Sequence, residues 1–517
     1  MYKILWVDDE IDLLKPYTLY LKNKGYEIDT ATNGQDAIEL CEKEIYDIVF
    51  LDENMPGLSG LETLSKIKEV RPNIPIVMIT KSEEENIMDM AIGNKIADYL
   101  IKPVNPSQIL MTLKKHIHKR DIINTQTTTS YRQEFMQIGS QLNNTVTYED
   151  WYDLYKKLVY WDFKLTETDN ELRDLLQSQK SEANAFFAKY IKNNYLDWIN
   201  NPDERPLLST DIFKKRIFPL LDKKEKIFFI VIDNFRYDQS KLLIELLSEL
   251  YSVEKEELYF SILPTATQYA RNAIFSGLMP LQIKNMFPEF WVDEEDEEGK
   301  NNNEEELIKT LFNRYRRNNT FSYNKIFNSV GCEKVIDQLN NLSGNDINIC
   351  VINFIDMLSH ARTDSKIVQE LANTEAAYRS VTKSWLKYSS TFGLFKELAR
   401  RGYKVVITTD HGTVFVDRPI KVVGDKNTNV NLRYKVGKAL AYNKKEVFEI
   451  NNPQKAMLPS PNISSTYIFA TENNFFAYPN NYNYYVNYYK DTFQHGGVSM
   501  EEMLIPFITL TPKKIRV

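Results

Sequence analysis

Short apolar runs that alternate with amphipathic stretches are the most constraining feature of this chain, and they occupy the first 118 of its 517 residues. The apolar runs are typical of buried strands, whereas the amphipathic stretches have helical spacing. Strands that alternate with helices form a parallel sheet with both faces covered. The sequence therefore predicts an α/β domain, with strands at Ile4–Val7, Ile48–Leu51, Ile76–Ile79 and Ala97–Ile101 and helices at Gly34–Glu44 and Leu61–Val70.

Two further regions follow, because a chain of this length exceeds what one hydrophobic core supports. Residues 119–205 lack strand-like runs, and Trp151, Leu154 and Leu158 recur at helical spacing, which predicts a helical-bundle connector. Buried-strand patterns return in residues 206–517, which predicts a second and larger α/β domain. The acids and asparagines of Trp291–Glu306 predict a solvated surface loop.

Composition and charge narrow the class of protein. The net charge of −7 argues against a protein that coats nucleic acid, because phosphate binding favours a basic surface. The three cysteines form no CxxC pair, and we expect buried, reduced thiols. We expect no signal peptide and no membrane span, so the sequence predicts a cytoplasmic protein.

Two histidines, His116 and His118, lie at a basic helix end, where we expect them to be solvated.

Polar residues stand at the ends of the strands predicted for the first domain. Asp8 and Asp9 follow the first strand, Asp52 follows the second of those named above, and Thr80 and Lys102 follow the last two. Chemistry in a parallel α/β sheet collects at the carboxyl ends of the strands. This set suits phosphoryl transfer to a carboxylate, with Asp52 as the acceptor and Lys102 as the cation that neutralises the phosphoryl oxygens.

A magnesium ion and a conformational switch belong to the same prediction. Mg²⁺ prefers oxygen ligands and needs few carboxylates. The Thr80 hydroxyl can bond to the attached phosphoryl group, and Tyr99 can then move into the vacated space, which biases a two-state element. The oxygen ligands that we expect for Mg²⁺ come from Asp8, Asp9, Asp52 and Asn54.

These motifs, with Met55-Pro56-Gly57 after the acceptor, resemble the bacterial response-regulator receiver family over about the first 118 residues. The resemblance implies a flavodoxin-like receiver domain that is phosphorylated on Asp52.

Three of the five histidines lie beside or near aspartates in distinctive places. Asp356 and His360 are four residues apart and share one face of a helix, if a helix starts there. Zinc takes nitrogen and oxygen ligands and keeps a position open in catalytic sites. One predicted zinc site consists of Asp356, His360 and His495, and the other consists of Asp233, Asp410 and His411.

The segment Leu263-Pro264-Thr265-Ala266-Thr267 leads into a helical stretch and supplies a candidate nucleophile. A Thr267 hydroxyl that bridges to the second metal would have a lowered pKa, which makes it a nucleophile. Two metals roughly 4 Å apart stabilise the attacking and leaving oxygens of an in-line displacement. Thr265 lies in the same motif, so either threonine can fill this role.

Several side chains are candidates for substrate binding. Arg271 lies one helical turn after Thr267, and Asn431, Arg433 and Lys435 alternate, so a strand there would present them on one face. We expect them to hold substrate oxygens; a solvated basic edge is the alternative. The dense tyrosines of residues 467–489 can stack bases, although surface or core positions are the commoner use of such residues.

The order Asp, Pro-Thr-x-Thr, Asp-x-x-x-His, Asp-His-Gly and His-Gly resembles the alkaline phosphatase superfamily over residues 206–517. Segments 233–238 and 270–277 are most similar to its PglZ branch. The resemblance implies two zinc ions, and it favours Thr267 as the nucleophile because the nucleophile of this superfamily usually begins the helix. Phosphomonoesterases and sulfatases use similar ligands, so the class of ester stays open.

The whole chain resembles the PorX-type response regulators, which are associated with type IX secretion. The resemblance implies a sensor histidine kinase and an extracytoplasmic-function sigma factor as partners, and dimerisation on phosphorylation. It also implies phosphodiesterase action on nucleotide signals. We therefore expect a zinc phosphodiesterase for nucleotides or oligonucleotides that is controlled through Asp52.

A protein-docking regulator is the alternative hypothesis. Phosphorylation would then expose a surface for a sigma factor or a secretion component, and the zinc-bound domain would be dispensable as a catalyst. Direct and specific DNA binding is disfavoured, because no helix-turn-helix candidate follows the first domain.

Overall fold

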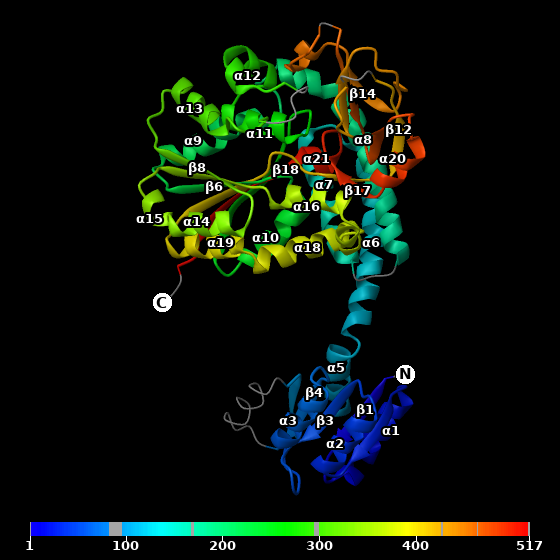
Figure 1. The fold of residues 1–517 in the computed structure, drawn as a ribbon. Coiled ribbons are helices and arrows are strands. Elements are labelled where there is room, and N and C mark those ends of the chain that lie inside the picture. Colours follow the sequence, from blue (N-terminus) through cyan, green and yellow to red (C-terminus); the bar gives the residue numbers. More distant parts are fainter. Residues whose placement is uncertain are drawn as a thin grey trace. The chain divides into compact units, whose positions relative to one another are not determined.

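The structure is a computed structural model that describes residues 2–81, 96–166, 170–293, 299–424, 428–462 and 464–514. The chain divides into two compact units, Met1–Gln133 and Glu134–Val517, which are described separately below. Figure 1 traces both units along the sequence. None of the described helices is both long and apolar enough to cross a membrane.

The first unit is built on a parallel sheet of five strands in the order β2-β1-β3-β4-β5. Helices α2 and α3 cover one face and α1 and α5 cover the other, so each face carries its own apolar core. The strands are β1 (Lys3–Val7), β2 (Glu27–Ala31), β3 (Ile48–Asp52), β4 (Ile76–Thr80) and β5 (Asp98–Ile101). The helices are η1 (Ile11–Leu14), α1 (Lys15–Asn23), α2 (Gly34–Lys43), α3 (Gly60–Val70), α5 (Pro106–His116) and the start of α6 (Lys119–Asn144).

This sheet confirms the predicted α/β fold. Two of the predicted strands, β3 and β4, are buried on both faces, which is why their sequences are continuous apolar runs. Helix α3 starts at a capping box in which Ser59 and Glu62 satisfy each other's backbone N–H groups. Asp8, Asp52 and Thr80 therefore lie at one edge of the sheet, where the parallel strands end.

The prediction that His116 and His118 are solvated was wrong. The Nε2 atom of His116 lies 3.1 Å from Asp98 Oδ2, and its side chain is mostly buried. The Nε2 atom of His118 lies 2.8 Å from the Tyr26 hydroxyl, and its ring packs edge-on against Tyr2. Both rings therefore connect the end of α5 to residues of the sheet region. Helical spacing alone did not indicate this role.

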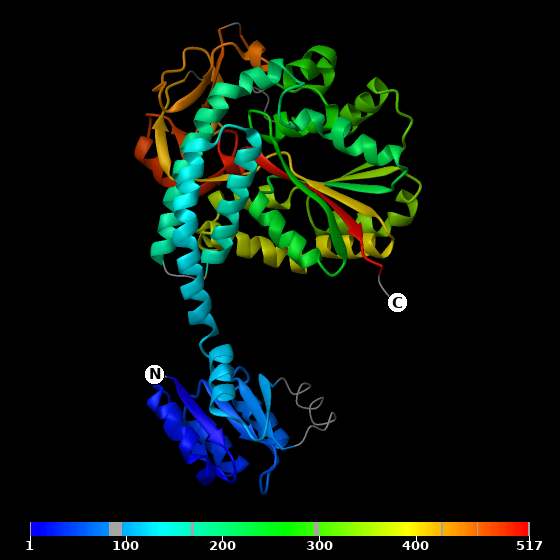
Figure 2. The same ribbon diagram turned by 180° about the vertical axis from the view of Figure 1, so that it is seen from behind.

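The second unit contains a mixed sheet of six strands in the order β7-β18-β10-β6-β9-β8. Strands β10, β6, β9 and β8 are parallel, whereas β18 and β7 are antiparallel to their neighbours. Figures 1 and 2 show helices on both faces of this sheet. The strands are β6 (Ile227–Ile232), β7 (Tyr251–Phe260), β8 (Phe321–Ile326), β9 (Ile347–Ile352), β10 (Lys404–Thr408) and β18 (Leu504–Pro512).

The residues of β6 alternate between two cores. Phe228, Ile230 and Ile232 face a cluster that includes residues of four helices, α10 (Tyr237–Leu247), α14 (Ser329–Asp337), α18 (Glu375–Tyr388) and α19 (Ser390–Arg400). Phe229 faces the other side, where Phe213 links it to α11 (Thr267–Ser276) and α13 (Glu304–Arg314) through edge-on ring contacts. Helices therefore pack against both faces of this sheet, as predicted for the larger α/β domain.

Three small sheets follow β10 and carry the last part of the chain toward β18. They pair β11 (Val414–Val416) with β17 (Thr492–Gln494), β12 (Arg418–Lys421) with β16 (Asn474–Ala477), and β13 (Tyr434–Gly437) and β14 (Val447–Ile450) with β15 (Thr466–Ala470). The remaining helices are α7 (Tyr148–Leu165), α8 (Asn170–Asn200), α9 (Phe218–Asp222), α10 (Tyr237–Leu247), α11 (Thr267–Ser276), α12 (Pro280–Met286), α13 (Glu304–Arg314), α14 (Ser329–Asp337), α15 (Leu339–Leu342), α16 (Phe354–Asp364), α17 (Lys366–Leu371), α18 (Glu375–Tyr388), α19 (Ser390–Arg400), α20 (Tyr482–Tyr489) and α21 (Met500–Met503). Single turns lie at η2 (Ser209–Asp211), η3 (Phe213–Ile217), η4 (Pro288–Phe290) and η5 (Pro453–Ala456).

The helices α7 and α8 of the predicted connector pack into the second unit and do not form a third one. Their aromatic side chains meet the end of β7, where Trp198 packs edge-on against Phe260 at 4.9 Å between ring centroids. Phe187 stacks on the same ring, and Trp151 packs edge-on against Phe187. The connector therefore shares its apolar core with the larger domain.

A buried network of ion pairs also joins these helices to the larger domain. The Lys180 ammonium on α8 lies 2.5 Å from Glu375 on α18 and 3.3 Å from Asp162 on α7. Glu375 also contacts Arg236, which lies in the loop after β6, and Asp162 contacts Arg379. Burial is unfavourable to each charge alone, but the paired charges around it lower the pKa of Glu375 far below its usual value.

Removing one partner from this network should destabilise the second unit strongly. We expect Lys180→Met to lower the free energy of unfolding by about 3–5 kcal/mol, because Glu375 and Asp162 would stay buried with less compensation. Lys189→Met is the matched control, since Lys189 lies on the same helix but is exposed. Urea denaturation followed by tryptophan fluorescence measures both variants. Equal stability of the two variants would mean that the network contributes nothing net.

Candidate functional site

The acidic cluster of the first unit lies at the carboxyl ends of β1 and β3. Asp8 and Asp52 are almost fully buried, and the Lys102 ammonium lies 2.8 Å from Asp8 Oδ2 and 2.9 Å from Asp52 Oδ2. Asp8, Asp9 and Asp52 offer carboxylate oxygens within 4.8 Å of one another. The structure thus brings together the predicted acceptor, its cation and the acidic ligands.

The electrostatics of this cluster suit a cation and a phosphoryl group. Burial raises the pKa of Asp52, and the neighbouring Lys102 offsets this only in part. Asp52 Oδ1 is buried and accepts no hydrogen bond from any described residue. A carboxylate oxygen without a partner, next to two further aspartates, fits a hard cation such as Mg²⁺. The backbone of Asn54 contacts the Asp52 carboxylate, so the fourth predicted ligand lies at the cluster as well.

The two predicted switch residues lie on the neighbouring strands. Thr80 is fully buried at the end of β4, and Tyr99 is half-buried on β5, where it pairs with Met78 of β4. Lys102 follows β5 directly. The three residues therefore occupy adjacent positions from which a change at Asp52 can be passed to β4 and β5.

The second unit gathers the predicted zinc ligands at the carboxyl ends of three parallel strands and at a nearby small sheet. Asp233 follows β6, Asp410 and His411 follow β10, Asp356 and His360 lie on α16 after β9, and His495 follows β17. Two groups of three donors result, each with ligand atoms within 4.8 Å of one another. The groups are Asp356 with His360 and His495, and Asp233 with Asp410 and His411.

The group around Asp233 is completely buried. Burial would raise the pKa of Asp233, but the charges of Arg271 and His411 together lower it. Burial and the charge of Asp233 raise the pKa of Asp410 well above its usual value. Asp410 Oδ2 accepts no hydrogen bond from the described residues, although Arg271 Nη1 lies 3.6 Å away. Such an oxygen is suited to a metal ion, which would restore the Asp410 carboxylate to its charged form.

Two of the histidines are held in the form that binds metals. His411 Nδ1 lies 3.1 Å from the Gly412 carbonyl oxygen, and His495 Nδ1 lies 3.1 Å from the Thr265 carbonyl oxygen. A carbonyl oxygen can only accept, so each Nδ1 donates and each Nε2 keeps its lone pair. Burial lowers the pKa of both imidazoles to about 4, which keeps them neutral.

The group around Asp356 is more open. Asp356 Oδ1 lies 3.8 Å from His495 Nε2, and Asp356 Oδ2 lies 3.5 Å from His360 Nε2. The side chain of His360 is 67% exposed, so this group faces solvent on one side. Three nitrogen and oxygen donors per group, one group of them open, fit zinc sites that keep a position for a reactant.

The two candidate nucleophiles differ in their surroundings. Thr267 begins α11, and its hydroxyl lies 3.1 Å from His411 Nε2 and 3.4 Å from Asp233 Oδ1. The Thr265 hydroxyl is fully buried, donates to the Gly497 carbonyl and accepts from the Gly496 N–H. Thr265 therefore ties the His495 loop in place, whereas Thr267 faces the donor atoms.

The residues predicted to bind substrate have other partners. Arg271 is fully buried, and it contacts Asp233 at 2.6 Å and Glu304 at 2.5 Å. Its guanidinium thus neutralises the carboxylates of the site and is not open to a substrate. The prediction was wrong because helical spacing places a residue on a face but does not reveal the acid that will pair with it.

The predicted strand face of Asn431, Arg433 and Lys435 does not form, because β13 begins only at Tyr434. Arg433 is fully buried and pairs with the buried Glu502 at 2.6 Å. The Lys435 ammonium donates to the Asn429 carbonyl, and the Asn431 side chain accepts from the Arg433 backbone. These contacts occupy the charged groups of Arg433 and Lys435, whereas substrate binding by Asn431 stays a prediction.

Two residues of the site were missed from the sequence. Asn353 precedes α16, and its side-chain amide donates to Asp233 Oδ2 at 3.0 Å. Glu304 was assigned to a solvated acidic loop, yet it is fully buried and accepts from Arg271. Trp291, at the other end of that loop, is also buried, and residues 294–298 lie outside the described residues. Asn353 directly follows β9, and its polar side chain at the end of an apolar run was the available sign of a role.

Three families match the chain in succession. The sequence matches the response regulator receiver domain over residues 4–114 and the PorX response regulator linker domain over residues 121–199. It matches the BREX system PglZ alkaline phosphatase-like domain over residues 212–510. The last match covers more than half of the chain.

Two curated relatives each match 22% of the chain. The transcriptional regulatory protein ResD of Bacillus subtilis is 36% identical over 112 residues, which are 22% of this chain and 46% of ResD. A CpxR homolog of Haemophilus influenzae is 36% identical over 116 residues, which are 22% of this chain and 49% of that protein. The chain thus spans about half the length of the curated relatives it matches.

Solved structures also match the first unit. The response regulator TrrA of Thermotoga maritima, in complex with Mg²⁺ and BeF, is 32% identical; the match covers 23% of this chain and 100% of that chain, with a TM-score of 0.21. CheY4 of Vibrio cholerae is 29% identical, with 23% and 99% covered and a TM-score of 0.22.

The family matches and the order of the domains agree with the two clusters described above. The chain belongs to the PglZ alkaline phosphatase-like family, in the PorX-type arrangement in which a response regulator receiver domain and a helical linker precede the PglZ domain.

Proposed function

We propose that the chain is a two-component response regulator that a sensor histidine kinase phosphorylates on Asp52, and that its PglZ domain is a di-zinc phosphodiesterase. The observation that carries the enzymatic part is the presence of two three-donor groups, one of which contacts the Thr267 hydroxyl through Asp233 and His411. The substrates are nucleotide or oligonucleotide phosphodiesters. Control of type IX secretion from the cytoplasm, dimerisation on phosphorylation and binding of an extracytoplasmic-function sigma factor belong to the same proposal.

In the receiver domain, Asp52 attacks the phosphorus of the donor, and the bond from phosphorus to the donor's leaving group breaks. The Lys102 ammonium lies 2.9 Å from Asp52 Oδ2, so it can form an ion pair with the phosphoryl oxygens once the group is attached to Asp52. Magnesium bound by Asp8, Asp9, Asp52 and the Asn54 carbonyl would neutralise further phosphoryl charge. The Thr80 hydroxyl and Tyr99 then carry the change to β4 and β5.

In the PglZ domain, the Thr267 oxygen attacks the phosphorus of the diester and one alcohol leaves with a proton. Water then hydrolyses the phosphothreonine diester, which frees Thr267 and releases a phosphomonoester. Zinc ions held by the two donor groups would stabilise the attacking and leaving oxygens. Arg271 keeps the buried carboxylates of Asp233 and Asp410 close together, and the Thr265 contacts hold the His495 loop.

The tyrosines of α20 support a substrate that carries bases. Tyr484, Tyr485 and Tyr488 are exposed, and the helix packs beside β16 in the segment that leads through β17 to His495. Exposed aromatic rings stack on bases of any sequence.

Removal of zinc tests the enzymatic part of the proposal. We expect purified protein to contain two zinc ions per chain and to hydrolyse nucleotide diesters, and we expect chelation to lower the rate about 100-fold or more. Elemental analysis and a hydrolysis panel of mono- and diesters measure this. Zinc, but not magnesium alone, should restore the rate. Protein with zinc that hydrolyses no ester would disprove the enzyme and leave a docking regulator.

Phosphorylation adds a second arm to the same experiment. The panel is repeated after treatment with acetyl phosphate, with sizing by light scattering in parallel. We expect a shift toward dimers in the treated sample. A monomer at every level of phosphorylation would contradict the dimerisation part without affecting the assignment of Thr267.

A further inference from the structure

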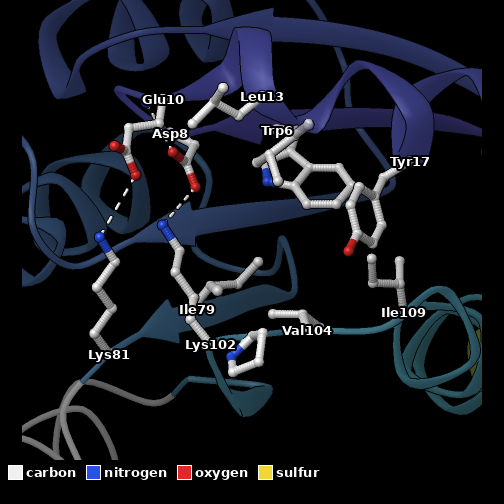
Figure 3. A pocket seen from close by; sticks show the side chains of 12 residues that line it. Trp6, Asp8, Glu10, Leu13, Tyr17, Ile79, Lys81, Lys102, Val104 and Ile109 are labelled. Carbon is white, nitrogen blue, oxygen red and sulfur yellow. Dashed lines mark hydrogen bonds and ion pairs between the residues drawn. The ribbon is translucent and has the colours of Figure 1, made fainter.

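The first unit contains a pocket beside the acidic cluster that phosphoryl transfer does not require. Its volume is about 410 Å³, within the range of about 300–1,000 Å³ that is typical of small-molecule sites. It lies between the η1–α1 segment and the connection from β5 to α5, and Figure 3 shows the side chains that line it. Asp8 and Lys102 form its boundary with the cluster at Asp52.

The pocket has the shape of a slot between an aromatic and an aliphatic wall. Trp6 of β1 and Tyr17 of α1 form one side, with ring centroids 6.3 Å apart at an angle of 64°. Ile79, Val104 and Ile109 form the other side (Figure 3). A flat ring fills such a slot with contacts on both of its faces, so the lining favours a planar, largely apolar ligand.

One buried donor in the slot lacks an acceptor. Trp6 is 1% exposed, and no described residue accepts a hydrogen bond from its Nε1–H group. Figure 3 shows the indole nitrogen on the edge of the ring that is turned toward Asp8 and Lys102. A buried N–H group without a partner is unfavourable, and an acceptor on a ligand would satisfy it. The indole therefore selects for a ring nitrogen or a carbonyl oxygen.

The charges around the slot cancel one another. Lys102 Nζ lies 2.8 Å from Asp8 Oδ2, and Lys81 Nζ lies 3.5 Å from Glu10 Oε2. Two bases and two acids in pairs leave no net charge for a charged ligand to match. An anion or a cation would have to break one of these pairs, so a neutral molecule is favoured.

We propose that this slot binds a neutral, planar heteroaromatic molecule that accepts a hydrogen bond from Trp6 Nε1. Lys102 lines the slot and also contacts Asp52, so a ligand that alters the position of Lys102 changes phosphorylation of Asp52. This coupling rests on the proposed role of Asp52, whereas binding in the slot does not.

Quinoline and naphthalene are matched probes for the slot, because they have the same shape and only quinoline has an acceptor. Saturation-transfer NMR with the full-length protein measures binding of each probe. We expect quinoline to bind at millimolar concentration and Trp6→Phe to weaken it about fivefold, the loss of one neutral hydrogen bond. Naphthalene has no acceptor, so Trp6→Phe should weaken its binding less than that of quinoline.

A second variant shows where the probe lies. Val104→Phe should fill the slot and abolish binding of both probes, whereas Met111→Phe, at a position 71% exposed on α5, should leave it unchanged. No binding of quinoline to the wild type, or equal binding to Val104→Phe, would overturn the site. Unchanged affinity in Trp6→Phe would overturn the assigned donor.

The coupling is measured separately. The rate of Asp52 phosphorylation by acetyl phosphate is followed with and without saturating quinoline, in the wild type and in Val104→Phe. We expect a quinoline-dependent rate in the wild type alone. Quinoline that binds without changing the rate would overturn the coupling and leave the site intact. A wild type that is never phosphorylated would contradict the proposed function of Asp52 instead.

Discussion

Thr267→Val should lower the rate of phosphodiester hydrolysis by about a thousandfold or more, because it removes the oxygen that attacks the phosphorus of the diester in the proposed mechanism. Valine has nearly the same shape as threonine, and Thr267 begins α11 without a side-chain capping bond, so the helix should form normally. Zinc content should stay at two ions per chain. Steady-state hydrolysis and elemental analysis of the same preparation measure both quantities.

Thr265→Val is the matched control for this experiment. It removes the bonds of the Thr265 hydroxyl to Gly497 and Gly496 but leaves the Thr267 hydroxyl beside Asp233 and His411. We expect a modest loss of stability, about 1–3 kcal/mol, with hydrolysis retained. The reverse result, an inactive Thr265→Val and an active Thr267→Val, would assign the nucleophile to Thr265. Secretion that persists in cells with Thr267→Val would favour protein docking as the main output.

Asp52→Asn should abolish phosphorylation of the receiver domain by acetyl phosphate. The amide is a poor nucleophile, and it also weakens the attraction to Lys102 that positions the acceptor. Intact mass spectrometry should show one added phosphoryl group on the wild type and none on the variant. Dimerisation induced by acetyl phosphate should be lost with it.

Asp12→Asn is the control for the acceptor. Asp12 lies in η1, its side chain is 85% exposed, and Lys15 is its one ion-pair partner among the described residues of the first unit. We expect this variant to gain the phosphoryl group at the wild-type rate. Phosphorylation of Asp52→Asn at that rate would show that another residue is the acceptor.

The strands and the positions of the candidate metal ligands were predictable because each depends on local sequence. A strand buried on both faces must be apolar throughout, as β3 and β4 are, and a residue that follows such a strand lies at the edge where ligands gather. Asp233 and the Asp410-His411 pair follow β6 and β10 in this way. Their convergence could therefore be inferred before the packing was known.

The partners of buried charges could not be inferred in this way. Arg271 looks like an open basic residue one turn into a helix, and its pairing with Glu304 depends on how α13 packs against α11. Arg433 is paired with Glu502, which is far along the chain. A sequence shows which charged residues a chain contains, but tertiary packing determines which of them form ion pairs.

The shared core of the connector helices and the PglZ domain determines where the chain can be cut or recombined. A fragment that starts at residue 206 would expose the Phe260 ring, and it would leave the buried Glu375 carboxylate without its partner Lys180. Chimaeras that exchange receiver domains between relatives should therefore be joined within α6, before Glu134, where the second unit begins. In evolution, α7 and α8 should accordingly be inherited with the PglZ domain and vary together with α18, while the receiver domain can be replaced on its own.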